Sequence, residues 1–375
     1  MTLSILPVRG RALLDRFIRL PERLHRHDAA YIAPLHMERH DALTPKNPFF
    51  GHAEVQFWLA VEDGRDVGRI SAQIDRHALA VRPDATGLFG MIAAEDDPEI
   101  FRLLLDTAAQ WLRARGMTRM QGPFNLNINE EMGLLVDGFD TPPMLLMGHD
   151  RPYVGARLEA HGLVREKDVL AYLYDIRTDL PEGARRLVER PLPDGLVVRP
   201  IDFKRYHAEI RTVTDIFNDA WAGNWGFVPL DATETDYLAK SLKPLLDARL
   251  VFMAEWRGEA VGFLVTLPNL NEAIRDLNGR LFPFGLAKML WRLKVTGVKT
   301  ARVPLMGIRR SASRGIIGSL LPFLLIDRVR RNASAMGFTH IELSWILEDN
   351  LPMRRINESL GGVAYKTYRI YQKPI

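Results

Sequence analysis

Three arginines and two glycines lie within ten residues of the chain, Arg309 to Gly318. A glycine-containing turn that leads into a helix presents unpaired backbone N–H groups and the positive end of the helix dipole. The side chains of Arg310 and Arg314 add charged donors that suit a phosphate group. The stretch therefore has the chemistry of an anion site, and a solvated basic loop is the alternative interpretation.

Carboxylates and tyrosines capable of proton transfer follow within sixty residues. Glu342 stands between Ile341 and Leu343 in an apolar run, and Glu348 lies just beyond the end of this run. A buried glutamate can have a raised pKa and act as a base, whereas an ion pair with an arginine is the structural alternative. Three tyrosines in the last segment, of which Tyr365 is the first, could donate a proton or simply pack.

A third polar group lies in the first half of the chain. Asn125, Asn127 and Asn129 alternate along a stretch that continues into Glu130 and Glu131. Alternate residues of an extended segment line one face, so these side chains could bind a polar headgroup. An Asn-rich loop that caps its own backbone is the equal alternative.

The elements around the basic loop follow in a regular order. The apolar run 301–308 predicts a buried strand, and the pattern from about 316 to 336 predicts a helix. Because proline is tolerated mainly in a first helical turn, Pro322 moves the expected start towards Leu320. The next elements are a strand and a short helix: 340–347 and 352–360, the helix opened by Asn350.

The N-terminal half predicts a similar order, which indicates a duplication of one fold. Its expected elements are a hairpin around 63–66, a strand at 87–92, a helix at 98–115 and a strand at 117–122. Proline and glycine gather at 179–195, which predicts a linker. The predicted organisation is an N-terminal lobe, 1–178, this linker, 179–195, and a C-terminal lobe, 196–375.

Residues 310–318 resemble a loosened form of the Arg/Gln-x-x-Gly-x-Gly/Ala acyl-CoA loop of GNAT-type acyltransferases. The helix, the strand and Asn350 follow in the order of that superfamily. The whole chain resembles its long two-lobed bacterial branch, with which it shares several phrases. These are Pro48–Ala53, Val67–Ile70, Gly122–Asn125, Gly138–Pro143 and Ser344–Asn350.

The resemblance implies an α/β (α+β) fold of two tandem GNAT-like lobes, each a mixed, mostly antiparallel sheet flanked by helices. The first lobe is expected to be degenerate. It has Glu95, Asp96 and Asp97 where the second lobe has its Arg/Gly turn. Three carboxylates would repel a pyrophosphate, so only the second lobe is expected to bind CoA.

The implied activity is N-acyl transfer from acyl-CoA or acetyl-CoA, used as a cosubstrate, to an amine by direct attack. The branch is associated with a ceramide synthase-like reaction, in which a long-chain sphingoid base is acylated, and an acyl carrier protein is a second conceivable donor. A small-molecule N-acetyltransferase is an alternative, and a non-catalytic acyl-CoA-binding or scaffold protein is another.

The resemblance also assigns expected roles to residues. The cofactor-binding set is Met306, Ile308, Arg310, Arg314, Gly315, Gly318 and Asn350. The catalytic candidates are Glu342, Glu348 and Tyr365, and Trp225 joins Asn125, Asn127, Asn129 and Glu131 as substrate-binding candidates. The family often places a proton-donating tyrosine seven residues after the Asn, but this chain has Asn357 there. The identity of the general acid is therefore open.

The amino-acid composition indicates the class of protein and excludes several kinds of site. With 47% hydrophobic and 26% charged residues the chain is typical of a globular protein. It has no cysteine, which excludes disulfides, a thiolate nucleophile and Cys-ligated metal. His25, His27, His36 and His40 lack the spacing of a metal site, so no metal is expected. No apolar run is long enough to span a bilayer, which favours a cytoplasmic protein.

Positive charge is concentrated in one part of the chain. Residues 275–331 hold 13 Lys and Arg against two Asp, whereas the whole chain has a net charge of +4. Within 275–300 the basic residues alternate with Phe, Leu and Trp, a pattern that suits an anionic membrane surface or a lipid amine substrate. A peripheral location on the inner membrane is thus an option, with a core helix as the alternative. No recognition motif indicates a nucleic-acid partner.

Overall fold

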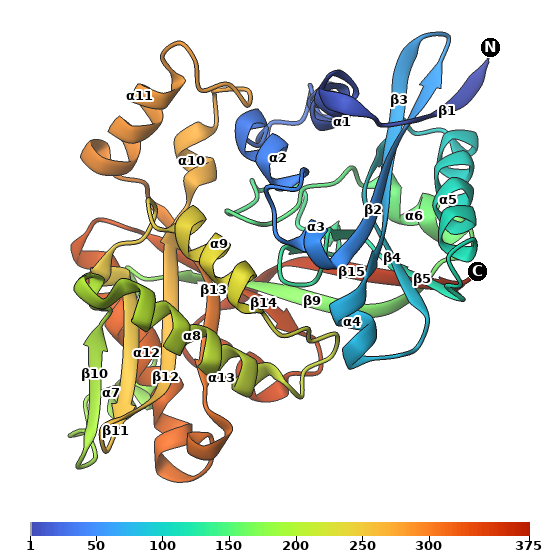
Figure 1. The fold of residues 1–375 in the computed structure, drawn as a ribbon. Helices are drawn as coiled ribbons and strands as arrows, with labels where there is room; N and C mark the ends of the chain where they lie inside the picture. Colours follow the sequence, from blue (N-terminus) through green and yellow to red (C-terminus); the bar gives the residue numbers. More distant parts are fainter. Residues whose placement is uncertain (1) are drawn as a thin grey trace. The chain divides into compact units, whose positions relative to one another are not determined.

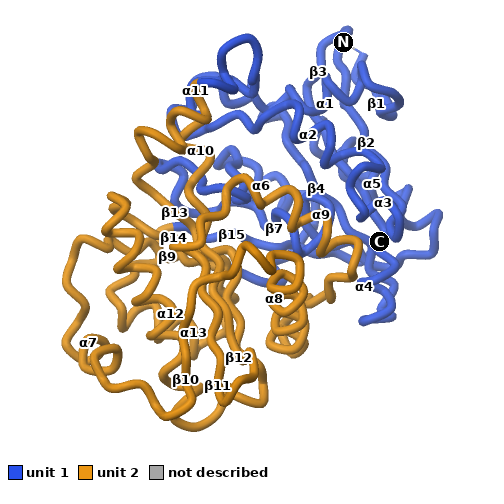
Figure 2. Tube along the Cα trace, turned by 60° about the vertical axis from the view of Figure 1, so that its left-hand side comes forward, with its two compact units in different colours: residues 1–169, 274–287, 366–375 blue, residues 170–273, 288–365 orange. Residues whose placement is uncertain are grey.

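The computed structural model describes residues 2–375 and divides into two compact units (Figure 2). Unit 1 comprises residues 1–169, 274–287 and 366–375, and unit 2 comprises residues 170–273 and 288–365. Each unit contains a hairpin, a further strand, a long helix and a strand parallel to the preceding one (Figure 1). This shared order confirms the predicted duplication.

The sheet of unit 1 runs in the order β1-β2-β3-β4-β5-β15. Its neighbours pair antiparallel except β4 and β5, which are parallel. The predicted turn at 63–66 joins the hairpin strands β2 and β3. The strands are β1 (Leu3–Pro7), β2 (Ala53–Glu62), β3 (Arg65–Asp75), β4 (Thr86–Ala94), β5 (Arg119–Gly122) and β15 (Val363–Pro374).

Two helices cover opposite faces of this sheet because successive side chains of a strand alternate. Phe57 and Leu59 of β2 belong to the apolar cluster that includes α1 (Gly10–Leu24), whereas Trp58 and Ala60 belong to the cluster with α5 (Pro98–Arg113). The shorter elements of unit 1 are α2 (His36–Ala42), α3 (Phe49–His52), α4 (Arg76–Val81), β6 (Phe124–Asn125), β7 (Glu131–Met132), β8 (Leu134–Asp137) and α6 (Tyr153–Ala160).

The sheet of unit 2 runs in the order β9-β14-β13-β12-β11-β10, with β13 and β14 parallel. Leu264 of β12 belongs to the apolar cluster that contains the long helix α12, while Phe263 lies at Gly307 beside Ala220 of α8. The two helices therefore lie on opposite faces. The elements are β9 (Val164–Asp175), β10 (Leu196–Pro200), α8 (Tyr206–Trp221), β11 (Val251–Trp256), β12 (Glu259–Pro268), β13 (Thr300–Ile308), α12 (Gly315–Ala335) and β14 (His340–Leu347).

Two expectations differ from the structure of unit 2. Helix α12 begins at Gly315 rather than near Leu320, so Pro322 lies inside the helix. Burial of Leu321, Leu324 and Leu325 in the core outweighs the local penalty of proline. The segment 179–195, expected as a linker, carries α7 (Glu182–Val188), and its Leu180 and Ala184 are buried in the same core.

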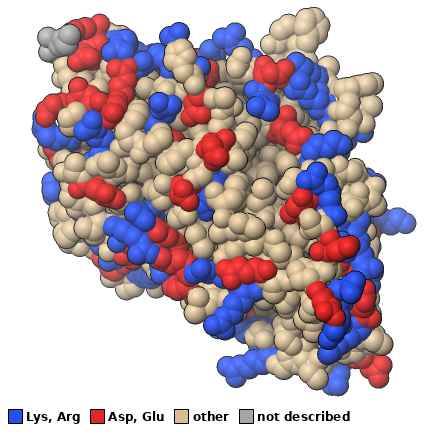
Figure 3. Space-filling model, turned by 180° about the vertical axis from the view of Figure 1, so that it is seen from behind, with Lys and Arg blue, Asp and Glu red and all other residues tan. Residues whose placement is uncertain are grey.

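The remaining elements of unit 2 connect or edge the sheet. They include α9 (Ala232–Leu242), α10 (Leu270–Ile274), the π-helical turn Arg292–Thr296 and α13 (Leu351–Ser359). Residues 285–287 of α11 (Gly285–Trp291) belong to unit 1 and its remaining residues to unit 2. Among residues 2–375, no helix combines the length and the apolar character that crossing a bilayer requires. Lys and Arg side chains alternate with Asp and Glu over the face drawn in Figure 3.

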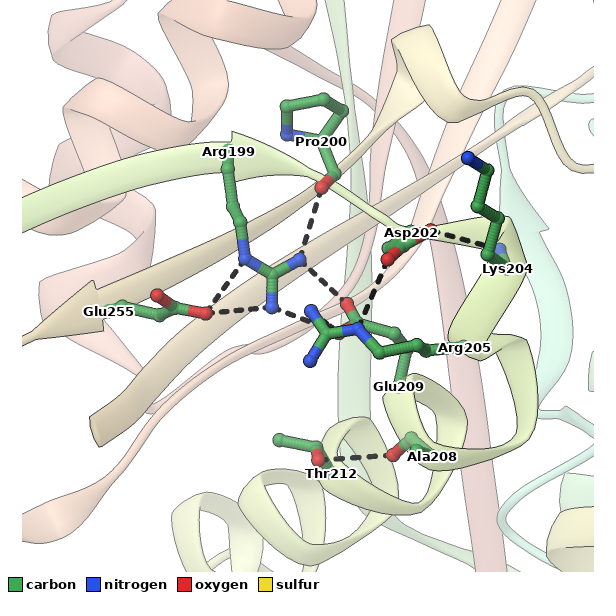
Figure 4. Close-up of polar contacts among 9 residues, drawn as sticks. All are labelled: Arg199, Pro200, Asp202, Lys204, Arg205, Ala208, Glu209, Thr212 and Glu255. Carbon is green, nitrogen blue, oxygen red and sulfur yellow. Dashed lines mark hydrogen bonds and ion pairs between the residues drawn. The ribbon is translucent and has the colours of Figure 1, made fainter. Parts of the chain in front are cut away.

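An ion-pair network ties the edge strand of unit 2, β10, to its first long helix, α8 (Figure 4). The Arg199 guanidinium donates to both carboxylate oxygens of Glu209 at 2.8 and 2.9 Å and to Glu255 at 2.7 Å. Arg205 adds a contact of 3.4 Å to Glu209, whose side chain is only 6% exposed. Because a buried carboxylate needs its partners, we expect this network to stabilise the unit.

Replacement of Arg199 by methionine is expected to destabilise the protein by about 2–4 kcal/mol, because Glu209 would lose its bidentate partner while still buried. Urea unfolding would measure the change. The double variant Arg199→Met/Glu209→Met should recover much of the loss, since no buried charge is then left. A loss in the double variant equal to the sum of the two single losses would contradict this.

Candidate active site in unit 2

The pairing between strands β13 and β14 ends at a β-bulge in β13. From Val265 to Leu267 strand β12 advances two residues, while its partners on β13, Leu305 and Arg302, are three apart. The extra residue in β13 defines the bulge and bends the strand. The pairing of β13 with β14 ends at the same point, at Val303 and Leu343. Residues 304–308 thus have no strand partner in β14 within the described part of the chain.

The unpaired part of β13 contains Met306 and Ile308, both predicted to contact the acyl donor. The Met306 carbonyl accepts a hydrogen bond of 3.0 Å from the indole N–H of Trp221, the last residue of α8. Gly307 lies so close to Phe263 that a Cβ there would come within 2.8 Å of its ring. The backbone at Met306 and Gly307 is therefore held by these two contacts.

The basic loop after β13 is held by acidic residues of α8. Arg309 pairs with Asp215 and donates to the Ala260 carbonyl at 2.9 Å. The backbone N–H of Arg310 donates to Asp219 at 2.7 Å, and its side chain contacts the same carboxylate at 3.2 Å. Arg310, predicted as a phosphate ligand, thus helps to anchor the loop.

The start of α12 is an open helix N-terminus. Its N-cap residue is Arg314, and no side chain among residues 2–375 caps the first turn. Arg314 is exposed, with no ion pair recorded to any described residue. Gly315 adopts φ +72°, and a Cβ on Gly318 would lie 2.1 Å from the carbonyl carbon and oxygen of Ser313. Only glycine at 318 allows the loop to pack this closely.

In unit 1 a side chain of the protein caps the N-terminus of the corresponding helix. Its helix α5 follows Asp97, whose carboxylate accepts a hydrogen bond of 2.7 Å from the Glu99 N–H. Glu95 pairs with Arg23 and Arg65. The helix terminus that could receive an anion in unit 1 is therefore occupied by the protein's own carboxylate, consistent with a first lobe that does not bind CoA.

Glu342 and Tyr365, predicted separately, lie in one buried polar network. The Tyr365 hydroxyl donates to one Glu342 oxygen, and the Ser344 hydroxyl donates to the other at 2.5 Å. The Arg302 guanidinium lies 3.4 Å from Glu342 and donates to the Ser344 hydroxyl at 2.8 Å. The Arg302 and Glu342 side chains are 2% and 0% exposed, so Glu342 is a buried carboxylate with a full set of partners.

Arg302 and Ser344 were missed by sequence reasoning. Arg302 lies between Ala301 and Val303, as Glu342 lies between Ile341 and Leu343, so each is a charge inside an apolar strand. The register aligns Arg302 with Glu342 on neighbouring parallel strands. Two opposite charges in adjacent apolar strands were therefore a signal of a buried pair.

The other residues predicted after β14 have separate positions. Glu348 lies beyond the strand, and its backbone carbonyl accepts a bond of 2.8 Å from Arg354. The Asn350 side chain accepts a hydrogen bond of 3.3 Å from the Met353 N–H and so caps α13. Trp225, a substrate candidate, is half-buried in the turn after α8. Glu348 and Asn350 therefore both contact α13.

The environment of the Asn357 side chain destabilises the folded protein. It is fully buried, and neither its Nδ2 nor its Oδ1 has a hydrogen-bond partner among the described residues. On the same helix Arg354 and Glu358 contact the Tyr172 hydroxyl of β9, so Asn357 lies on the part of α13 that faces the sheet. An unpaired buried amide is destabilising.

Replacement of Asn357 by leucine is therefore expected to increase the free energy of unfolding by about 1–2 kcal/mol. Asn47→Leu is the matched control, because the buried Asn47 amide donates to Ala42 and Glu130 and accepts from Phe49. The control should destabilise. Equal destabilisation by both substitutions, measured by urea unfolding, would show that Asn357 has partners.

The asparagine-containing segment 125–129 of unit 1 forms hydrogen bonds within the protein. Asn125 accepts from the Met91 N–H at 2.8 Å and donates to Glu131 at 2.9 Å. Asn127 is buried and accepts from the Asn129 N–H at 2.9 Å. Strand β4 carries a bulge like that of β13, since Arg69 and Ser71 pair with Ala93 and Gly90. In unit 1 the Asn125 side chain thus binds the backbone N–H of Met91, which lies at the bulge of β4.

Glu131 lies among half-buried ionisable residues, of which the sequence singled out only Glu130. Burial raises the pKa values of Glu130 and Asp150 to about 7. Arg39 lies 3.2 Å from Glu131. Arg39 and Asp150 come from other segments, so sequence spacing alone could not bring them together with Glu131.

Of the four histidines considered for a metal, His25 lies in a cluster with Asp28 and His149. Both rings contact the Asp28 carboxylate, at 3.3 and 3.0 Å, and the three possible ligand atoms lie within 4.8 Å of one another. Burial lowers the pKa of His25 to about 4. Arg151 stands 3.7 Å from the same carboxylate, and its positive charge opposes a cation there.

Comparisons with known proteins agree with this architecture. No family model matches the chain. A tandem GNAT protein from the clavulanic acid biosynthesis pathway superimposes on 100% of the chain and 98% of its own length with a TM-score of 0.58, at 15% identity. The fold is thus that of tandem GNAT proteins.

Two curated proteins are similar along almost their entire lengths. The bacterial ceramide synthase of Caulobacter vibrioides is 55% identical over 377 aligned residues, covering 100% of this chain and 98% of its own. Protein YghO of Escherichia coli is 43% identical over 364 residues, covering 96% and 93%. The chain belongs to the family of the Caulobacter ceramide synthase, and its fold is that of tandem GNAT proteins.

Proposed function

We propose that this protein is an N-acyltransferase that transfers a long acyl chain from acyl-CoA to a sphingoid base. The observation that carries the proposal is the 55% identity, over the full length, to a protein named bacterial ceramide synthase. The geometry of unit 2 supports it, because an unpaired strand edge, an open helix N-terminus and a buried acid–tyrosine pair occur together in this unit.

The donor is proposed to bind between the start of α12 and the unpaired part of β13. The first N–H groups of α12 and the side chain of Arg314 would hold the pyrophosphate. Gly315 and Gly318 allow the loop conformation, while Arg310 anchors it through Asp219. The backbone at Met306 and Ile308 would contact the thioester arm, and Asn350 would act indirectly by capping α13.

The reaction forms one C–N bond and breaks one C–S bond. The amine lone pair attacks the thioester carbonyl carbon, and the sulfur departs with the C–S electron pair as a thiolate. The bound ammonium group loses one proton before the attack, which is released to solvent, and the nitrogen loses a second proton after the attack, which finally reaches the thiolate. A free thiol has a pKa of about 8.5, so this leaving group needs little help at neutral pH, and deprotonation of the amine is the step that needs a base.

Tyr365 is proposed as the group that exchanges this proton. Both oxygens of Glu342 already accept hydrogen bonds, and its side chain is fully buried. Glu342 therefore acts through the Tyr365 hydroxyl, and Arg302 and Ser344 hold Glu342 in place. Glu348 remains a second candidate base at the end of β14.

For the acceptor we propose that Glu131 binds a cationic amine together with the half-buried carboxylates of Glu130 and Asp150. Carboxylates near a buried site favour an ammonium group. Asn125, Asn127 and Asn129 would act by shaping this loop. The Asn125 side chain donates to Glu131 and accepts from the Met91 N–H, and the Asn127 side chain accepts from the backbone N–H of Asn129. Trp225 of unit 2 is proposed as a substrate contact.

An acceptor comparison tests the proposal. Purified protein would be given palmitoyl-CoA or acetyl-CoA with sphinganine, with octylamine, or with hexadecanol, and products would be identified by mass spectrometry. Palmitoyl transfer to sphinganine, with none to the alcohol, is expected. Acetyl transfer to the short amine alone would favour a small-molecule N-acetyltransferase. Binding of acyl-CoA without any product would favour a non-catalytic role.

A further inference from the structure

The segment 280–296 exposes apolar side chains that a core helix would bury. Phe282, Phe284 and Trp291 are 71%, 79% and 59% exposed, and Leu290 and Val295 are also exposed. Helix α11 (Figure 1) has no buried residue. This exposure excludes the alternative that the segment is a core helix. Exposed apolar surface of this kind usually marks an interaction site.

The segment is anchored and is not an extended tail. Leu281 and Val298 are buried at its two ends, and Met289 and Leu293 pack against the core of unit 2. The exposed side chains are therefore presented by a folded helical segment. Large aromatic side chains held in this way suit the boundary between lipid headgroups and acyl chains.

All the charged residues within this segment of the sequence are basic. Between Asp276 and Asp327 the chain contains no Asp or Glu, whereas Arg280, Lys288, Arg292, Lys294 and Lys299 all lie within 280–299. Lys294 and Lys299 donate to backbone carbonyls, of Pro244 and Gly337, and Asp247 is a carboxylate near enough to Lys294 for its pKa to be lowered by that charge. An anionic surface complements such a segment.

We propose that the segment 280–296 docks the protein onto an anionic lipid bilayer, with Phe282, Phe284 and Trp291 entering the headgroup region. The proposal rests on the proposed function in one respect, because a sphingoid base is itself held in a membrane and docking would bring the enzyme to its acceptor. Binding to lipid can nevertheless be measured without any turnover.

Co-sedimentation with vesicles tests the proposal. The full chain is expected to bind vesicles of phosphatidylglycerol and phosphatidylcholine, to bind pure phosphatidylcholine weakly, and to be released by high salt. The variant Phe282→Ser/Phe284→Ser/Trp291→Ser should partition about tenfold less. The variant Arg280→Glu/Lys294→Glu should lose the preference for anionic lipid. The matched control replaces three exposed valines elsewhere, Val164, Val197 and Val363, with serine and should bind like the natural protein.

Two results would overturn the proposal. One is absence of binding to anionic vesicles by the natural protein. The other is equal binding by the triple aromatic variant. If that variant instead changes the oligomeric state while the natural protein ignores vesicles, the surface is an interface between copies. Turnover of a water-soluble amine should be unaffected by the variant, so failure of turnover in the natural protein would count against the proposed function and not against docking.

Discussion

Replacement of Tyr365 by phenylalanine is expected to lower kcat for amine acylation by about 100-fold, because general acid–base catalysis typically contributes at least that much. The Tyr365 hydroxyl connects the buried Glu342 carboxylate to the side of the network that is not fully buried. Its loss would remove the route by which a proton reaches Glu342, while the KM for acyl-CoA should change little.

The matched control is Tyr371→Phe. The Tyr371 hydroxyl contacts Glu159 at 3.2 Å in unit 1 and has no part in the Glu342 network, so kcat should remain near that of the natural protein. Thermal unfolding of both variants separates catalysis from folding. If Tyr365→Phe retains full kcat and only lowers the melting temperature, the network is structural.

Replacement of Gly318 by alanine is expected to raise the KM for acyl-CoA about 10-fold to 100-fold, the loss that a displacement of about 1 Å in a binding loop can produce. The new Cβ would lie 2.1 Å from the Ser313 carbonyl, which is backbone and cannot rotate away. The loop that carries Arg314 must therefore move relative to the first turn of α12.

Alanine substitutions of two other glycines serve as controls for this prediction. Gly315→Ala meets no atom within 4 Å but must adopt φ +72°, which costs about 1–2 kcal/mol of backbone strain. Gly183→Ala in α7 meets no atom and has no such constraint. The KM should thus increase in the order Gly183, Gly315, Gly318. An unchanged KM in Gly318→Ala would show that the loop does not bind the donor.

Local sequence signals predicted the elements of the site well. The Asp63-Gly64 turn defined a hairpin because few residues other than Gly and Asp adopt its backbone conformation. The glycines after β13 likewise indicated a tight loop before α12. These features depend on neighbouring residues, so they can be read from a single sequence.

Features that depend on tertiary contacts could not be read in this way. The start of α12 was placed too late because the penalty of Pro322 is local, whereas the burial that compensates for it is not. The partners of Asn125 and Glu131 come from other segments, such as Met91 and Arg39. The β13 bulge became visible only in the register with β12.

The central claim, that unit 2 transfers an acyl group from CoA to an amine, is tested most directly by the release of free CoA. The chain has no cysteine, so a thiol reagent such as Ellman's reagent reports CoA without background from the protein. With palmitoyl-CoA, thiol release should require sphinganine and should fall at least tenfold in Arg314→Glu, since the reversed charge would repel the pyrophosphate. Release that is independent of the amine, or equal in the variant, would contradict the claim.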